Sequence, residues 1–197
     1  MHQDLPDELT TLLEDPDAMV ISLDGNLEID TGIRVNRPGM VIEGNGNKLV
    51  AKDITPTQAG LLITNDGVII RNLTIEATGD YALKVFGRDK VAIENVTAIS
   101  HTKGAIQVNG SNVTLAGDIV TEAPWGGIEV CKSSRGAIPC LMVNAKSITC
   151  NTPGVPAIWV DKAVEDGLEN AVINMSGILK KMDIPAEKGE VDQIWFK

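Results

Sequence analysis

Aromatic residues are scarce in this sequence, which contains two Phe, one Tyr and three Trp among 197 residues. Since 43% of the residues are hydrophobic but only 3% are aromatic, the core has to be built from aliphatic side chains. Long apolar runs are also missing, and none reaches the roughly 18 residues that a membrane-spanning helix requires. No basic segment followed by an apolar stretch, the mark of a signal peptide, opens the chain. We expect one soluble domain over residues 1–197, without a transmembrane segment.

Positive charge is scarce as well, because 17 Lys and Arg stand against 27 Asp and Glu and give a formal net charge of −10 at pH 7. Proteins that bind a phosphate backbone concentrate Lys and Arg on one surface and release counterions there. We therefore expect no nucleic-acid partner.

The cysteines are few and odd in number: Cys131, Cys140 and Cys150. They lack the short paired spacing and the neighbouring His residues of a zinc site. We therefore predict no metal site and no other cofactor. Two interpretations of the cysteines stay open. Either all three are buried thiols, or Cys131 and Cys140 form a disulfide across the loop between them, which would suit an exported protein.

A short signature recurs along the chain, consisting of a small residue, an aliphatic residue, any residue and a second aliphatic residue. The six copies are GIRV at 32–35, GLLI at 60–63, ALKV at 82–85, AIQV at 105–108, GIEV at 127–130 and AIWV at 157–160. Their first residues lie 28, 22, 23, 22 and 30 positions apart. A period between 20 and 50 residues is typical of solenoids and not of an ordinary globular domain.

Further strand-like segments keep the same period. GVIIRNLTI at 67–75, KVAIENVTAI at 90–99 and NVTLAGDIV at 112–120 each follow one signature copy. Asn72 and Asn95 occupy equivalent positions, and we expect them to stack at one turn, pointing inward, as Asn ladders do in stacked parallel strands. Turns that each contribute two or three short strands form right-handed parallel β-helices.

The predicted fold is therefore an all-β, single-stranded right-handed parallel β-helix of about six turns. A solenoid needs covered ends, because exposed strand edges pair with other chains. The Leu spacing in LPDELTTLLED predicts an amphipathic capping helix at about 6–14. At the other end, Trp195 and Phe196 indicate an apolar C-terminal flap at about 191–197.

Three segments together resemble a known family: residues 8–50, which include the turn IEGNGN, then WGGIEV at 125–130 and PAIWVD at 156–161. They are similar to the pectate-lyase-like adhesive domain of surface proteins in Gram-positive bacteria, within the pectin-lyase-like superfamily. The resemblance implies a right-handed β-helix that is secreted to the cell surface as one module of a larger protein. It also implies adhesion to a glycan or matrix component instead of catalysis.

The residue between the two aliphatic positions of each signature points outward if those positions point inward. Parallel strands lie about 4.8 Å apart, so Lys84, Gln107 and Glu129 would form a polar strip about 10 Å long, on the scale of a sugar ring. A flat aromatic side chain binds the apolar face of a sugar, while carboxylates and amides bind its hydroxyls. The predicted ligand-binding residues are Lys84, Gln107, Asn109, Trp125, Glu129, Trp159 and Asp161.

Each aromatic candidate has a structural alternative. Trp125 either receives a ligand or closes the turn by packing over Gly126 and Gly127. Trp159 either contacts a partner or packs beneath the C-terminal flap. His101 is expected to be a solvated turn residue.

Two function classes remain open. The first is a non-catalytic binding or adhesion module whose partner is a polysaccharide or another cell-surface or matrix component. The second is a carbohydrate-active enzyme, a polysaccharide lyase or glycoside hydrolase acting on acidic polysaccharide. For the second class, the candidate acids and bases are Asp80, Glu129, Asp161, Lys84, Arg88 and Arg135. Glu129 and Asp161 lie one turn apart, within the separation that glycosidases use. A spacer role in a larger surface protein is a further alternative.

Overall fold

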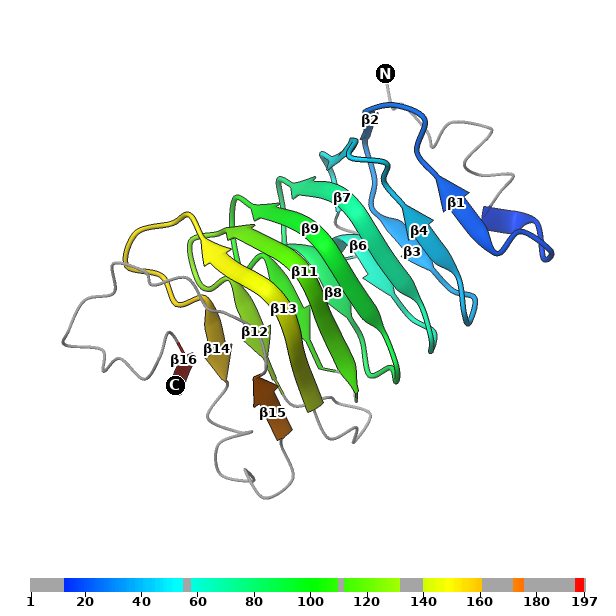
Figure 1. Cartoon of the computed structure of the whole chain (residues 1–197). Coiled ribbons are helices and arrows are strands. Elements are labelled where there is room, and N and C mark those ends of the chain that lie inside the picture. Colours follow the sequence, from blue (N-terminus) through cyan, green and yellow to red (C-terminus); the bar gives the residue numbers. More distant parts are fainter. Residues whose placement is uncertain are drawn as a thin grey trace.

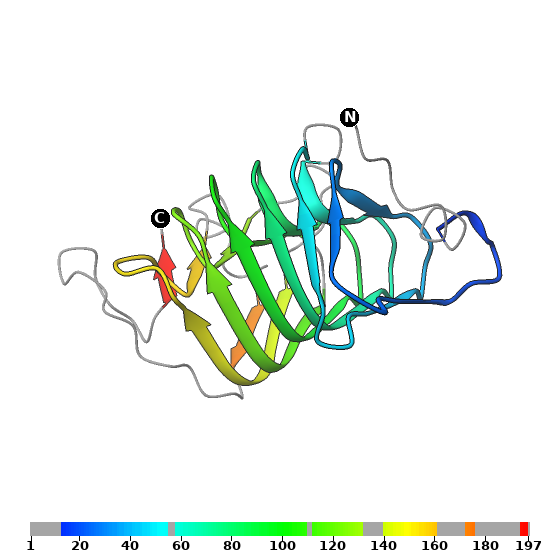
Figure 2. The same cartoon turned by 90° about the horizontal axis from the view of Figure 1, so that it is seen from above.

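The computed structural model describes residues 13–54, 58–109, 112–131, 140–160, 172–175 and 194–196. Within these residues, sixteen strands form two parallel sheets that follow one another around a coil (Figures 1 and 2). Sheet A contains β1 (Val20–Ser22), β2 (Leu27–Ile29), β4 (Val41–Glu43), β5 (Lys48–Ala51), β7 (Ile69–Ala77), β9 (Ala92–Ser100), β11 (Val113–Glu122), β13 (Cys140–Cys150) and β15 (Val172–Met175). Sheet B contains β3 (Ile33–Val35), β6 (Ala59–Ile63), β8 (Tyr81–Val85), β10 (Ile106–Val108), β12 (Ile128–Val130), β14 (Ile158–Val160) and β16 (Ile194–Phe196).

Each strand pairs with the equivalent strand one turn further along the chain, which confirms the predicted parallel β-helix. In sheet B, Ile106 of β10 is in register with Leu83 on one side and Ile128 on the other. All six copies of the signature lie in this sheet, so the predicted inward column exists. The repeat of 22 or 23 residues therefore corresponds to one complete turn of the coil.

The long strands of sheet A bend at a corner. The first part of β7 pairs with β4 and the second part with β5, and Asn72 lies between them with a φ of 53°. Asn95 adopts the same left-handed conformation one turn later, with a φ of 50°. Asn is one of the few residues other than Gly that reach this region easily.

The predicted stacking of these two residues is confirmed, but their predicted inward direction is wrong. Asn95 Nδ2 donates to Asn72 Oδ1 at 3.2 Å, and the backbone N–H of Asp118 donates to Asn95 Oδ1 at 3.0 Å. Asn95 is exposed and Asn72 is partly exposed. A left-handed residue interrupts the alternation of the strand, so the side chain leaves the core at the outside of the bend.

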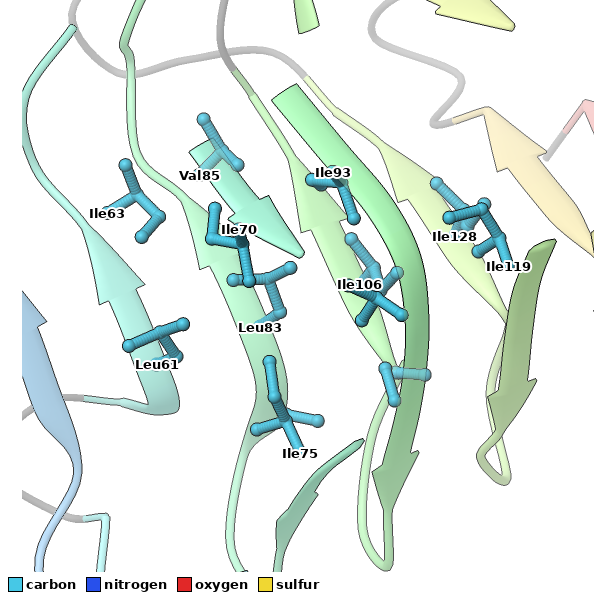
Figure 3. Packing of buried hydrophobic residues seen from close by; sticks show 14 of the residues in the cluster. Leu61, Ile63, Ile70, Ile75, Leu83, Val85, Ile93, Ile106, Ile119 and Ile128 are labelled. Carbon is cyan, nitrogen blue, oxygen red and sulfur yellow. The ribbon is translucent and has the colours of Figure 1, made fainter. Parts of the chain in front are cut away.

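The core is aliphatic, as the composition requires. Leu, Ile and Val side chains from the two sheets meet inside the coil (Figure 3), and the equivalent residues Val68, Val91 and Val113 are fully buried. Tyr81 is the one buried aromatic residue among those whose burial the structure describes, and it contacts Glu129 and Lys84 of the outward column of sheet B. It does not belong to the described hydrophobic cluster.

The predicted end covers are described only in part. Leu13 and Glu14 are helical and Leu13 packs against the core, while most of the segment 6–14 lies outside the described residues. Residues 194–196 of the predicted flap form β16, which continues sheet B beside β14; the rest of 191–197 lies outside the described residues. Among the described helical residues, none forms a helix long and apolar enough to cross a membrane.

Two of the three cysteines can be placed. Cys150 is a buried free thiol, and its Sγ lies 4.0 Å from the carbonyl oxygen of Thr152. Cys131 is 8% exposed at the end of β12. The side chain of Cys140 lies outside the described residues, so the alternative with a Cys131–Cys140 disulfide stays a prediction.

Candidate functional site

The predicted outward column of sheet B is present in the structure. The parallel register places Lys84 beside Gln107, Gln107 beside Glu129, and Glu129 beside Trp159, one residue per turn. Lys84, Gln107 and Trp159 are partly exposed, whereas Glu129 is only 8% exposed. The polar strip therefore exists, but its carboxylate is largely covered.

Tyr81 is a central residue of this face that the sequence analysis missed. Its hydroxyl donates a hydrogen bond to the Glu129 carboxylate, although Tyr81 belongs to β8 and Glu129 to β12, two turns further on. A Cβ at Gly104 would lie 2.9 Å from Tyr81 Cε1, so the intervening turn accommodates the ring only because Gly stands there. The available signal was positional: Tyr81, Gly104 and Gly126 each directly precede a signature copy.

The Tyr81 hydroxyl remains a donor over a wide pH range. Burial raises its pKa, and the hydrogen bond and negative charge of Glu129 raise it further. Since the protonated hydroxyl is the form that donates, the structure fixes the direction of this hydrogen bond: Tyr81 gives the proton and Glu129 accepts it.

Two lysines lie against the aromatic rings of the same face. Lys84 Nζ is 5.8 Å from the Tyr81 ring centroid and 5.7 Å from that of Phe86. Lys103 Nζ is 5.7 Å from the Tyr81 centroid and 5.9 Å from that of Trp125. Such distances fall within the range of cation–π attraction. We call the set Tyr81, Phe86, Trp125, Trp159, Lys84 and Lys103 the aromatic face.

The two lysines differ in their acidic neighbours. Lys103 Nζ forms a salt bridge of 2.9 Å with Asp80 Oδ2, so this candidate acid is already paired. Lys84 forms no salt bridge with any residue in the described part of the chain. In a protein with a net charge of −10, an ammonium group without a salt bridge to the described residues is available to an external anion.

Trp125 is 52% exposed at the turn that leads into β12. A Cβ at Gly126 would lie 3.2 Å from Trp159 Cε3, and one at Gly127 would meet Thr121 and Ala157. These glycines therefore make room for Trp159 and for the neighbouring turn. The two alternatives for Trp125, a ligand platform and a closure of its turn, both stay predictions.

The remaining candidate residues differ in their exposure and in their hydrogen bonds. Gln107 Oε1 is buried and has no hydrogen-bond partner among the described residues, so this oxygen is not exposed to a ligand in this conformation. Asn109 is 5% exposed, and its Oδ1 accepts the backbone N–H of Gly87 at 2.8 Å, so this side chain holds a turn together. Asp161 lies outside the described residues, as does the candidate base Arg135.

All six aromatic residues of the sequence lie on sheet B or directly beside it. Tyr81 is in β8 and Phe86 follows it; Trp125 precedes β12, Trp159 is in β14, and Trp195 and Phe196 are in β16. Trp159 is in register with Trp195. The described hydrophobic cluster contains none of Tyr81, Phe86, Trp125 and Trp159.

The candidate His101 has an acidic partner, whereas the candidate base Arg88 has a buried Nε without a hydrogen-bond partner among the described residues. His101 is exposed as expected, but its Nε2 lies 2.9 Å from Glu76 Oε1 at the end of sheet A. Glu76 also forms a salt bridge with Lys48. The hydrogen bond from Lys48 is the main cause that lowers the Glu76 pKa, and the contact with His101 is the second. Among the described residues, no group of three or more His, Cys, Asp or Glu side chains is arranged to hold a metal ion.

Comparison with known proteins gives one result. The model of a family described as a right-handed β-helix region matches residues 25–155, about two thirds of the chain. The match includes the turns that carry Tyr81, Lys84, Gln107 and Glu129. No curated protein and no solved structure matches the chain significantly.

Proposed function

The chain belongs to the right-handed β-helix family, and from that premise we propose that it is a non-catalytic binding module that takes a glycan on the aromatic face of sheet B. The observation that carries the proposal is the clustering of the few aromatic residues on this side, with Trp125 half exposed at its edge.

The chemistry of the face suits a sugar. Trp125 offers a flat apolar ring to the C–H face of a pyranose, while Lys84 offers donors to its polar groups. Lys103 lies over the Trp125 ring and fixes a cation at the rim of the same surface. A few polar groups among aromatic side chains are typical of sites that orient a small ligand.

The proposed setting is the cell surface, where the domain would act in adhesion. The resemblance of residues 8–50, 125–130 and 156–161 to pectate-lyase-like adhesive domains supports this setting, as does the concentration of recognition groups on one continuous sheet. In this proposal the partner is a polysaccharide or a glycan of a surface or matrix component, and the chain is one module of a larger surface protein.

A binding screen with two matched variants tests the proposal. Immobilised oligosaccharides would be screened with the unaltered protein, Trp125→Ala and Met19→Ala. Met19 is 49% exposed at the N-terminal end, so it controls for the loss of an exposed apolar side chain. We expect Trp125→Ala to weaken glycan binding about tenfold or more, equivalent to about 1.4 kcal/mol, with an unchanged melting temperature. Met19→Ala should bind like the unaltered protein.

Two results would overturn the proposal. The first is equal binding by all three proteins, which would place the interaction elsewhere. The second is cleavage of the bound polysaccharide, detected as new reducing ends or unsaturated uronate, which would make the protein a hydrolase or a lyase.

A further inference from the structure

Charge is unevenly distributed along the outward column of sheet B. In chain order the column contains Arg34, Leu62, Lys84, Gln107, Glu129 and Trp159, held in register from β3 to β14. Both cations occupy the first three positions, and the carboxylate lies in the fifth, beside a Trp. The column is therefore cationic toward the N-terminal turns, and acidic and aromatic toward the C-terminal turns.

The cationic end is open to an external group. Lys84 is partly exposed, is held between the rings of Tyr81 and Phe86, and has no salt bridge within the described residues. An ammonium group that is oriented by aromatic side chains loses little freedom when an anion binds it. One acidic group of a ligand fits this position.

The other end disfavours a second acidic group. Glu129 accepts the Tyr81 hydroxyl, and its negative charge contributes to the raised Tyr81 pKa. The register puts Glu129 two strands from Lys84, about 10 Å at the usual spacing of parallel strands. A like charge brought against a largely buried carboxylate is repelled more strongly than it would be in water.

The spacing of the turns along the axis limits how many acidic groups the ligand can place on the column. A sugar residue in an extended chain advances by about the distance between two neighbouring strands, so a chain along the column places about one sugar on each turn. A polymer with an acid on every residue would bring one anion to Lys84 and another to Glu129. A ligand with one acidic end avoids this conflict.

We propose that the ligand is an oligosaccharide that is acidic at one end only, with its acidic group at Lys84 and its neutral sugars extending past Gln107 toward Trp125 and Trp159. This inference rests on the proposed glycan-binding function and adds the charge pattern and the direction of the ligand. Charge complementarity along the column selects this ligand over a neutral glycan and over a uniformly acidic one.

The experiment compares three classes of trisaccharide by calorimetry: several neutral ones, several with a single carboxylate at one end, and trigalacturonate with three carboxylates. We expect the tightest binding in the class with one terminal carboxylate. Lys84→Gln should weaken binding of that class about tenfold and leave neutral trisaccharides unaffected. Lys146→Gln, the same charge change at an exposed position of sheet A, is the matched control and should change nothing.

A second variant tests the acidic end without disturbing the buried carboxylate. Gln107 is partly exposed, and Gln107→Lys would place a cation beside Glu129. It should raise the affinity for trigalacturonate at least several-fold. Tightest binding by neutral or by fully acidic trisaccharides, or no loss in Lys84→Gln, would overturn the inference.

The outcomes separate this inference from the proposed function. If neutral trisaccharides bind and Trp125→Ala abolishes that binding, but the charge of the ligand does not change the affinity, the proposed function is supported and the proposed charge pattern of the ligand is contradicted. If Trp125→Ala does not change the binding of any trisaccharide, or if no trisaccharide binds, both the proposed function and the proposed charge pattern are contradicted.

Discussion

At the residue scale, the candidate site is organised around the hydrogen bond between Tyr81 and Glu129. Tyr81 lies over Gly104 and reaches Glu129 two turns away, which links three turns of the coil through side chains. The ammonium groups of Lys84 and Lys103 also lie against the Tyr81 ring. A single Tyr therefore fixes one carboxylate and two cations relative to one another.

Titration of Tyr81 can be observed directly, because it is the only Tyr in the chain. Its pKa in the folded protein is raised above the ordinary 10.0, so the resulting stability is present below pH 10 and is lost as the pH rises toward the folded pKa. We expect no tyrosinate absorbance from the folded protein near pH 10, and a normal titration when the protein is unfolded in urea. A normal titration in the folded state would contradict the buried hydrogen bond.

Gly104 should not tolerate a side chain. Gly104→Ala places a Cβ 2.9 Å from the Tyr81 ring, so the ring has to move, and we expect a cost of about 1 to 3 kcal/mol, the usual range for overpacking. The urea midpoint measures this cost. Gly25→Ala is the control, because no atom lies within 4 Å of its added Cβ. Equal midpoints for the two variants would show that Tyr81 does not pack over Gly104.

At the scale of the elements, each strand is stabilised by the equivalent strands one turn before and one turn after it. β10 pairs with β8 and β12 through only three residues on each side, yet its inward residues Ile106 and Val108 are fully buried. Short strands suffice because the side chains stack into continuous columns. In a solenoid, the loss of one inward side chain weakens two interfaces.

Ile106→Ala is therefore expected to lower the free energy of unfolding by about 2 to 5 kcal/mol, the usual range for emptying a packed aliphatic site. Chemical denaturation with circular dichroism would measure it. Gln107→Ala, the outward neighbour in the same strand, is the control and should change stability by less than about 1 kcal/mol. An unchanged midpoint for Ile106→Ala would mean that this position is not part of the core.

At the scale of the whole molecule, the two sheets present different outer surfaces. The described outer side of sheet A carries ion pairs, such as Arg71 with Glu43 and Lys48 with Glu76, and the corner ladder of Asn72 and Asn95. Sheet B and its flanking turns carry the aromatic residues and all the cation–π contacts found among the described residues. The described outer side of sheet A is therefore rich in ion pairs, and that of sheet B is rich in aromatic side chains.

The ionic surface makes the protein sensitive to acid. The backbone N–H of Asn45 lowers the pKa of Glu43, and Lys48 with His101 lowers the pKa of Glu76. Lowered folded pKa values contribute stability above the ordinary pKa of 4.5, and this contribution is lost as the pH falls through the folded values. We expect the melting temperature to fall below about pH 4.5, less steeply for Glu76→Gln. An identical slope for the variant would show that Glu76 has no such role.

The sequence by itself determined the coil and its register. Each signature copy repeats the same alternation of inward and outward residues after 22 or 23 positions, so Leu83, Ile106 and Ile128 could be aligned without a structure. The column of Lys84, Gln107 and Glu129 followed from the same alternation. A repeat fold makes such predictions reliable, because the partner of each residue lies one period away in the chain.

Only the tertiary structure decided which outward residues are exposed to solvent. Glu129 and Asn109 are largely buried, because Tyr81 donates to the first across two turns and Gly87 donates to the second from a neighbouring turn. The outward direction of Asn72 and Asn95 followed from left-handed backbone angles that a strand pattern does not reveal. The sequence period determines the strand and the register position that each residue occupies. How far it reaches, and what covers it, depends on the residues of other turns, above all on the glycines that leave room for Tyr81 and Trp159.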